Sequence, residues 1–454
     1  MRLHPSSLHR SLREPVLGSI GFLNEVMSRY PEAVSFAPGA PHPDTLGDAD
    51  IQRHLDRFAD HLVRGGRTPE QARRLLVEYG PSRGIINDLV GAALRRDYGI
   101  DADPRAVVIT VGAQEAMLLV LRALFGTAEE ALAVANPCFV GIVGAARLLG
   151  VEVVPVDESE YGIDLDGLED TCATARAEGR PVRALYVAPD FSNPGGARLS
   201  LRCRHRLLDL AHREDFLIIE DNAYGFTATS GSELPPLKAL DTRQRVIHIG
   251  TFAKIAFPGA RVGYVIADQE VASSASGGVS RFLADELAAL KSVVTVNTSP
   301  LCQAVIGGML LEHGSSVLEL SRRKSALYQR NLTCLVDALD RHIDADLLPD
   351  VHWNRPRGGF FVRMRLPVPA DVALLETSAE TYGVLWTPME QFYLDGTGDH
   401  QLRLSCSYLD PGQIEEGVRR LALFLEREVG TVPSPQGRSA VPELPPGRRR
   451  RCRS

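Results

Sequence analysis

Residues 246–254 of the chain read Val-Ile-His-Ile-Gly-Thr-Phe-Ala-Lys, and this stretch decides the fold. Its apolar, β-branched beginning predicts a buried strand, and the stretch ends on Lys254. A lysine at the open end of a buried strand is unusual, because lysines are mostly solvated. An amine whose pKa is lowered there can form a Schiff base with an aldehyde cofactor or a carbonyl substrate. A single lysine is more often a surface residue, so the rest of the chain must decide.

Strand and helix patterns alternate around this stretch, between about residues 105 and 270. Because the predicted strands are continuously apolar, they favour a mainly parallel sheet that helices cover on both faces. Binding sites in such sheets lie beyond the carboxyl ends of the strands. The predicted strands are 107–110, 131–134, 151–156, 184–188, 216–219 and 246–249, and helices are predicted at 114–125 and 141–149.

The remaining patterns predict a second, smaller unit. This is expected, because a chain of 454 residues is longer than one hydrophobic core usually supports. They are a helical arm at 11–30, an irregular Pro- and Gly-rich segment at 34–41, a polar helix at 50–65, a mobile loop at 273–278, a long helix at 315–342, strands at 359–366 and 401–405, and a closing helix at 411–429. We therefore expect an N-terminal arm and substrate-closing segment at 1–48, a large domain at 49–310, a small α+β domain at 311–429 and a disordered Pro- and Arg-rich tail at 430–454.

Composition excludes several classes of protein. The chain has 50 basic and 57 acidic residues, a net charge of −7 that argues against a general nucleic-acid binder. Its 7 cysteines form no C-x-x-C pair, and its 12 histidines show no metal-binding spacing, so we expect reduced thiols and no metal. No apolar run reaches transmembrane length, and the N-terminus lacks the apolar core of a signal peptide. We expect a cytoplasmic protein without a membrane partner.

Three polar residues follow strands of the predicted sheet. They are Asn193, Asp221 and Lys254. Because the carboxyl ends of parallel strands meet at one edge of a sheet, these side chains can converge. Singly, an Asp after a buried strand is more often a helix cap, and an Asn before proline is more often part of a turn. The three together, in this order, indicate a site.

Each residue type suits one part of a pyridine cofactor. A pyridine ring withdraws electrons only while its nitrogen stays protonated, and a buried carboxylate such as Asp221 holds that proton by pairing. The amide of Asn193 and the phenol of Tyr224 can donate hydrogen bonds to the ring oxygen. A phosphate needs the N–H groups at a helix start and a nearby cation. Residues 110–114 predict such a helix start, and Thr251 with Arg261 supplies a hydroxyl and a cation.

The order and spacing of these motifs resemble the class I/II aminotransferases, which are pyridoxal-phosphate enzymes of fold type I. The resemblance covers residues 30–428 and implies a mainly parallel sheet of the seven-stranded type between helices, with a smaller C-terminal domain. The matching segments are Tyr79–Gly80 with Gly84, Gly112–Gln114, Asn136–Phe139, Ser192–Gly196, Asp221–Tyr224, Thr251–Lys254 with Arg261–Tyr264, and Arg403–Ser405.

The resemblance implies roles for these positions. Lys254 would form an aldimine with pyridoxal phosphate and carry a proton between the substrate α-carbon and the cofactor. Asp221 would pair with the pyridinium and, with Lys254 and Tyr224, make up the catalytic set. Arg403 would grip the substrate α-carboxylate as a planar fork, with Gly39 and Asn193 beside the substrate. The other implied cofactor contacts are Ala113, Gln114, Phe139, Asn193, Tyr224, Thr251, Arg261 and, reaching the neighbouring subunit of a homodimer, Tyr79.

A narrower resemblance and three departures bear on the substrate. Residues 22–39 are similar to aminotransferases that make unusual aromatic amino acids, such as dihydroxyphenylglycine, in antibiotic pathways. The family's Asn-Pro-Thr-Gly is here Asn-Pro-Gly-Gly, with Gly195 in place of Thr, and the serine often found before the lysine is Ala253. The Pro-Gly usually found in the second domain is replaced in residues 387–389, Thr-Pro-Met, which weakens any transfer of substrate identity.

The first hypothesis is an aminotransferase that moves an amino group between an L-amino acid and a 2-oxo acid. A second is another pyridoxal enzyme of secondary metabolism, catalysing elimination, replacement, cyclisation, oxidation or carbon–carbon bond formation, because the cofactor supports all of these. A regulator with an aminotransferase-like sensor domain would need an N-terminal DNA-binding domain, for which the residues before Val34 are too few. Arg363 and Arg365 share a strand face that either meets the acidic side chain of a substrate or is solvated.

Overall fold

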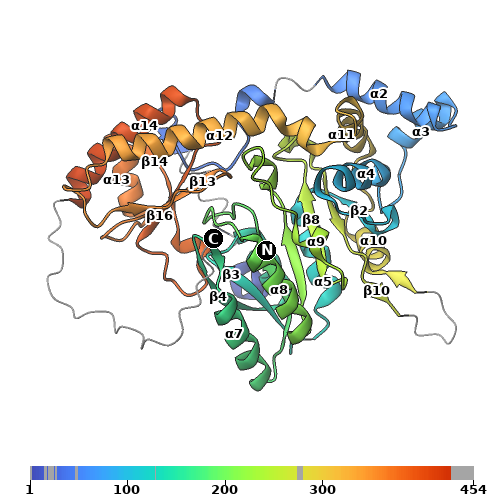
Figure 1. The fold of residues 1–454 in the computed structure, drawn as a ribbon, viewed down its shortest axis with the longest axis horizontal. Helices are drawn as coiled ribbons and strands as arrows, with labels where there is room; N and C mark the ends of the chain where they lie inside the picture. Colours follow the sequence, from blue (N-terminus) through green and yellow to red (C-terminus); the bar gives the residue numbers. More distant parts are fainter. Residues whose placement is uncertain are drawn as a thin grey trace.

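The computed structural model describes residues 3–14, 18, 25, 28–46, 50–127, 129–272 and 280–430 (Figure 1). Most of the helical arm predicted at 11–30, the loop predicted at 273–278 and residues 431–454 of the predicted tail lie outside this part of the chain. Among the described residues, no helix is both long and apolar enough to cross a membrane.

An eight-stranded sheet forms the larger part of the molecule, in the order β2-β9-β8-β7-β6-β3-β4-β5. The pairs from β8 through β7, β6 and β3 to β4 are parallel, whereas β9 and the two-residue β5 run antiparallel to their neighbours. The predicted mainly parallel sheet of seven strands is confirmed, with β5 added at its edge. The strands are β2 (Val107–Thr110), β3 (Ala131–Asn136), β4 (Glu152–Ser159), β5 (Gly162–Ile163), β6 (Val182–Val187), β7 (Leu217–Asp221), β8 (Val246–Thr251) and β9 (Gly263–Ile266).

Helices cover both faces of this sheet because its central strands are apolar on both faces. Alternate residues of one strand belong to different hydrophobic clusters, as Leu132 and Ala133 of β3 do. Helices α5 (Gly112–Leu124), α6 (Val140–Leu149) and α10 (Leu283–Val294) pack on one face, and α7 (Leu165–Ala177) and α8 (Leu201–Glu214) pack on the other. The second face is completed by α4 (Asn87–Tyr98) and α11 (Pro300–Glu312).

A smaller antiparallel sheet, in the order β12-β13-β16-β15, lies beside the large one (Figure 1). Its strands are β12 (His352–Trp353), β13 (Phe361–Arg365), β16 (Gln401–Ser405) and β15 (Thr387–Pro388). Helices α13 (Val372–Tyr382), α14 (Pro411–Phe424) and the long α12 (Val317–His342) pack around it, and Figure 1 shows α12 running from the large sheet to this one. The domain boundaries given above stay a prediction.

The prediction of an irregular segment at 34–41 is wrong for its first two residues. Val34 and Ser35 form β1, which pairs in parallel with β14 (Val384–Leu385). Two residues carry no strand periodicity of their own, so only the distant partner strand decides this element. The rest of the segment runs without helix or strand to Pro41 and reaches the cavity described below.

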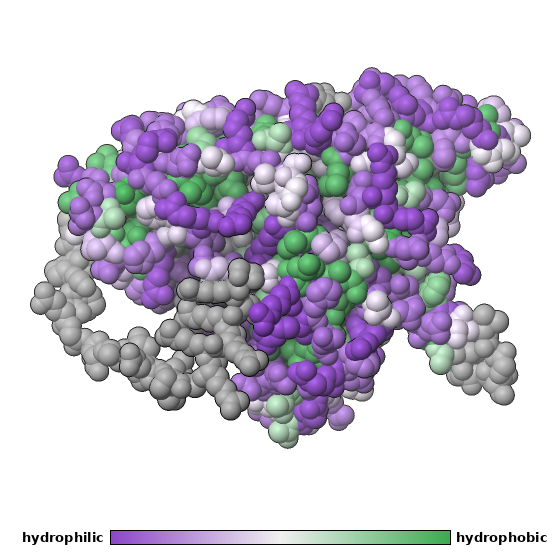
Figure 2. All heavy atoms as spheres, viewed as in Figure 1, coloured by the Kyte–Doolittle hydropathy of each residue, from purple (hydrophilic) through white to green (hydrophobic). Residues whose placement is uncertain are grey.

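The other predicted helices and strands are present, with boundaries that move by a few residues. The polar helix predicted at 50–65 is α2 (Ile51–Arg64), whose visible surface is mostly hydrophilic in Figure 2, and α3 (Pro69–Val77) follows it. Strands β7 and β8 extend to Asp221 and Thr251, so both residues end strands instead of following them. The other elements are α9 (Leu237–Leu240), β10 (Glu270–Val271), β11 (Arg281–Phe282), a π-helical turn at Leu425–Val429, and 3-10 turns at Pro5–Ser7, Arg10–Arg13, Pro43–Thr45, Pro104–Ala106, Gly225–Thr227, Pro258–Ala260 and Glu390–Phe392.

Candidate active site

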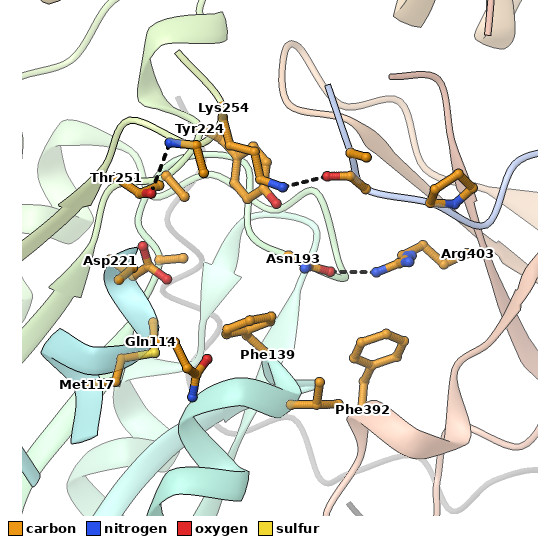
Figure 3. A pocket seen from close by; sticks show the side chains of 18 of the residues that line it. Gln114, Met117, Phe139, Asn193, Asp221, Tyr224, Thr251, Lys254, Phe392 and Arg403 are labelled. Carbon is orange, nitrogen blue, oxygen red and sulfur yellow. Dashed lines mark hydrogen bonds between the residues drawn. The ribbon is translucent and has the colours of Figure 1, made fainter. Parts of the chain in front are cut away.

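A cavity of about 440 Å³ lies where the large sheet's carboxyl edge meets the small sheet and residues 37–40 (Figure 3). All but one of the site residues predicted from the sequence line it. They are Gly39, Ala113, Gln114, Phe139, Asn193, Asp221, Tyr224, Thr251, Lys254, Arg261 and Arg403. The exception is Tyr79, which is 89% exposed and does not line the cavity. Its predicted reach into a neighbouring subunit stays a prediction.

Lys254 points into the cavity just beyond the end of β8. Its Nζ donates a hydrogen bond to the carbonyl oxygen of Gly39 at 2.6 Å (Figure 3). Burial, together with the nearby cations Arg403 and Arg261, lowers the pKa of the Lys254 amine to about 8, while the charge of Asp221 opposes this shift. The amine can therefore lose and regain a proton near neutral pH.

Asp221 ends β7 with its carboxylate buried at 7% exposure. The hydroxyl of Tyr186 donates to its Oδ2 at 2.6 Å, whereas Oδ1 is buried and has no hydrogen-bond partner among the described residues. Burial raises the pKa of Asp221 to about 6, against the hydrogen bond from Tyr186. A buried carboxylate oxygen facing a cavity without a partner is costly, so this atom suits a donor on a bound molecule.

The start of α5 forms the end of the cavity that suits an anion. Gly112 has φ 72°, and a Cβ added to it would lie 2.5 Å from a guanidinium nitrogen of Arg261. Glycine is therefore required both by its left-handed backbone and by the close approach of the arginine. Positive potential at this end comes from the N–H groups at the start of α5 and from the Arg261 guanidinium. The Thr251 hydroxyl lies there too, and it accepts a hydrogen bond from the Ala253 N–H at 3.1 Å.

Arg403 projects from β16 with 4% exposure. It donates to Asn193 Oδ1 at 2.7 Å and to the carbonyl oxygen of Ala37 at 2.9 Å, and its Nε has no partner among the described residues. Its guanidinium lies 4.4 Å from the ring centre of Phe361 and 5.0 Å from that of Phe392. Burial lowers the pKa of Arg403 to about 10, so the group stays charged at neutral pH.

The other predicted residues complete the walls. Burial and the charge of Asp221 raise the pKa of the Tyr224 phenol, while Arg403 and a hydrogen bond with Asn193 oppose them. Gln114 is fixed by a hydrogen bond from its Nε2 to the carbonyl of Gly141 at 2.8 Å. Phe139, at the start of α6, and Gln114 both face the cavity in Figure 3.

Sequence reasoning missed several lining residues. Tyr186 carried a usable signal, because it is the one polar-tipped side chain in the apolar run 184–188 that includes most of β6. Gln391 and Phe392 carried none, since they belong to a short turn after β15 whose place depends on the small sheet. Met389, one of the departures noted above, is fully buried against Val140 and Phe392 and so packs this turn onto α6. Met117, Ala188 and Ala223 were also missed.

Two arginines whose role the sequence left undecided lie outside this cavity. Arg363 and Arg365 line a separate cleft with Glu158 and Glu160 on its other wall. Arg365 is exposed, and the charge of Arg363 acts on the carboxyl of Glu158. Neither arginine lines the cavity, so neither would meet the side chain of a substrate bound there.

Comparison with known proteins gives the family. The model for "Aminotransferase class I and II" matches residues 65–421. The chain belongs to the class I and II aminotransferase family. The aminotransferase is 45% identical over 426 residues to the (S)-3,5-dihydroxyphenylglycine transaminase of Amycolatopsis orientalis, covering 93% of this chain and 95% of that protein.

Two solved structures resemble this aminotransferase closely enough to support its fold type. A kynurenine aminotransferase of Pyrococcus horikoshii, solved in complex with PMP, superimposes with a TM-score of 0.79 at 25% identity over 93% of this chain and 98% of that one. An α-aminoadipate aminotransferase of Thermus thermophilus, solved with N-(5'-phosphopyridoxyl)-L-leucine, gives 0.74 at 28% identity over 93% and 97%. The predicted family, fold type and aminotransferase function are confirmed, and the expectation of another pyridoxal reaction gives way to transamination.

Proposed function

We propose that this aminotransferase binds pyridoxal phosphate in the cavity and interconverts an L-arylglycine of the 3,5-dihydroxyphenylglycine type with its 2-oxo acid. The observation that carries the substrate is the 45% identity to the dihydroxyphenylglycine transaminase across nearly the whole of both chains. The resemblance of residues 22–39 to the same group of enzymes points in the same direction.

The residues of the cavity fit pyridoxal phosphate on three observations. Asp221 Oδ1 is a buried acceptor without a partner among the described residues, which suits a pyridinium N–H. The close approach of Arg261 to Gly112 at the start of α5 suits a phosphate. The Lys254 amine, with its pKa lowered to about 8, suits a covalent link to a carbonyl carbon.

The chain's own residues then divide the work. Pyridoxal phosphate, when bound, supplies the electron withdrawal that makes the substrate Cα–H acidic. Lys254 Nζ would carry the proton from the substrate Cα to the cofactor, since the amine titrates close to neutral pH. Asp221 would keep the ring nitrogen protonated through Oδ1. The Tyr186 hydroxyl donates a hydrogen bond to the other carboxylate oxygen of Asp221, Oδ2. Arg403 binds the substrate carboxylate, and Asn193 orients Arg403.

The surroundings of Arg403 support an aromatic substrate. In an arylglycine the ring is attached directly to Cα, so it must lie close to the carboxylate that Arg403 binds. Phe392 and Gln391 line the cavity next to Arg403, and they offer a ring face and an amide to a hydroxylated ring. The apolar lining of Val140 and Met117 adds no charge that an acidic side chain would need.

A homodimer is also part of the proposal. Exposed apolar side chains gather near Tyr79, and they are Val77, Val293, Val294 and Val296. A Cβ on Gly80 would lie 3.7 Å from Pro300, so the segment of Tyr79 lies beside the one that follows α10. Such a patch suits a second copy of the chain, and sedimentation of the holoenzyme tests it. The cytoplasmic location and a place in antibiotic biosynthesis stay predictions from the sequence.

One experiment tests the reaction and the substrate together. The purified holoenzyme is mixed with (S)-3,5-dihydroxyphenylglycine, L-tyrosine, L-2-aminoadipate or L-alanine and a 2-oxo acid, and both new products are quantified. We expect the arylglycine to have the highest kcat/KM, with equal amounts of its 2-oxo acid and of the new amino acid. Ammonia release without amino transfer would contradict the reaction, and a preference for 2-aminoadipate would contradict the substrate.

A further inference from the structure

A second carboxylate lies behind the turn that carries Asn193. Glu158, near the end of β4, accepts a hydrogen bond from the Ser192 hydroxyl at 2.9 Å. The same hydroxyl accepts from the N–H of Ala197 at 3.2 Å. The Ser192 side chain thus ties both ends of the turn at 192–197 to β4.

Gly195 leaves the space that this carboxylate occupies. A Cβ at residue 195 would lie 2.8 Å from Glu158 Oε2 and 3.3 Å from Ser192 Oγ. Gly195 is not among the glycines with positive φ, whereas its neighbour Gly196 is, with φ 70°. The backbone at 195 therefore accepts an L-residue, and the carboxylate is the obstacle. This contact accounts for the departure from Asn-Pro-Thr-Gly noted in the sequence.

The turn transmits its position to the substrate side of the cavity. Asn193 directly follows Ser192, and its Oδ1 accepts from Arg403 at 2.7 Å. Asn354 of the small sheet donates to the carbonyl of Gly195 at 2.7 Å, so the turn is held from both sheets. A shift at Ser192 therefore moves the amide that orients Arg403.

We propose that Glu158 is a positioning residue for the proposed aminotransferase reaction, acting through Ser192 on Asn193 and Arg403, with Gly195 as the position that makes room for it. The inference rests on the proposed function, because Arg403 is taken to bind the substrate carboxylate. Glu158 itself does not line the cavity.

The charges around Glu158 give this role a pH signature. Burial raises the pKa of Glu158 to about 7, and the hydrogen bond from Ser192 and the charge of Arg363 oppose the rise. Arg363 faces Glu158 from β13. The charge of Glu158 contributes to raising the pKa values of Tyr393 and Cys138. Glu160, His352 and Arg365 line the same cleft. As the pH falls through about 7, Glu158 loses the charge that holds Ser192 most strongly, so KM for the amino acid rises.

A double-mutant cycle on the holoenzyme tests the proposal. The Cβ of Gly195→Ala displaces the carboxylate from Ser192, so we expect KM for the amino acid to rise about tenfold, with a smaller change in kcat. Glu158→Ala produces a similar loss, and the double variant is no worse than Glu158→Ala alone, since the obstacle is gone. Gly126→Ala, where a Cβ meets nothing within 4 Å, is the matched control. Losses that multiply in the double variant overturn the proposal.

Glu158→Gln supplies an independent measurement if Gly195→Ala fails to fold. We expect its KM to be raised at pH 8 and to rise less than the wild-type KM as the pH falls below 7, because Asp221 and Lys254 titrate in both proteins. Because the folded-state pKa of Glu158 is raised, its contribution to wild-type stability falls as the pH rises from about 4.5 through about 7. The Tm of Glu158→Gln relative to wild type should therefore be higher at pH 8 than at pH 5.

The outcomes separate the two proposals. Equal pH profiles and a pH-independent Tm difference overturn the role of Glu158 while leaving the aminotransferase reaction in place. A wild-type enzyme that transfers no amino group overturns the proposed function, and the Tm comparison still reports on Glu158.

Discussion

The two halves of the active-site cavity are built from different kinds of sequence. The half at the edge of the large sheet comes from residues 112–261, and its key side chains end or closely follow strands of that sheet. The other half brings Ala37 against Arg403, which are 366 residues apart. A strand end fixes where a side chain goes, whereas contacts between distant loops depend on how two sheets pack. The sheet-edge half can therefore be predicted from the sequence, and the other half cannot.

Lys254→Ala tests the sheet-edge half with the largest expected effect. We expect kcat to fall by about 10³-fold or more, because the variant lacks both the covalent link and the group that moves the proton. Borohydride reduction followed by peptide mass spectrometry should label residue 254 in the wild type alone. A reducible lysine link that survives in the variant would show that another lysine does this work.

Arg403→Lys tests the other half. We expect KM for the amino acid to rise about 10- to 100-fold, because lysine cannot replace the planar fork or its place between Phe361 and Phe392. Arg365→Lys, at the exposed end of β13 in the same small sheet, is the matched control and should leave KM unchanged. Equal effects of the two substitutions would mean that general charge, and not the fork, attracts the substrate.

Tyr186→Phe sharpens the picture of the sheet-edge half, because it removes only the hydrogen bond to Asp221. We expect kcat/KM to fall about tenfold. The hydrogen bond lowers the pKa of Asp221, which is about 6, so its loss raises that pKa further. Asp221 then loses its charge at a higher pH as the solution is acidified. Cofactor release on dialysis from pH 8 to pH 5 should begin at a higher pH in the variant, and coincident release curves would contradict the role of Tyr186.

Thr387→Val is the smallest predicted effect and probes the other half. Thr387 is fully buried opposite Arg403 on β15, accepts from Arg403 at 3.3 Å and donates to Ala37 at 3.3 Å. Loss of these two long hydrogen bonds should raise KM about fivefold and leave kcat unchanged. Thr377→Val on α13, whose hydroxyl bonds only within its own helix, is the control. An unchanged KM would assign the orientation of Arg403 to Asn193 and the Ala37 carbonyl, without a part for Thr387.

Much of the fold could be predicted because burial has a local signature. The runs around Val108, Ile219 and Ile247 are apolar on both faces, and this marks strands of a covered sheet. Their boundaries were less certain, since Asp221 and Thr251 are polar and yet continue the pairing of β7 and β8. The pair of β1 with β14 could not be predicted, because two residues have no period.

The sequence by itself determined the large sheet and the chemistry of its edge. A buried strand that ends on Asp, another followed by Lys, and a glycine at a helix start each carry their own local reason. Only the tertiary structure decided that the carbonyl of Gly39 meets Lys254, that Phe361 and Phe392 enclose Arg403, and that Glu158 fills the space at Gly195. Backbone carbonyls are alike in every residue, and a missing Cβ has meaning only beside the atom that takes its place.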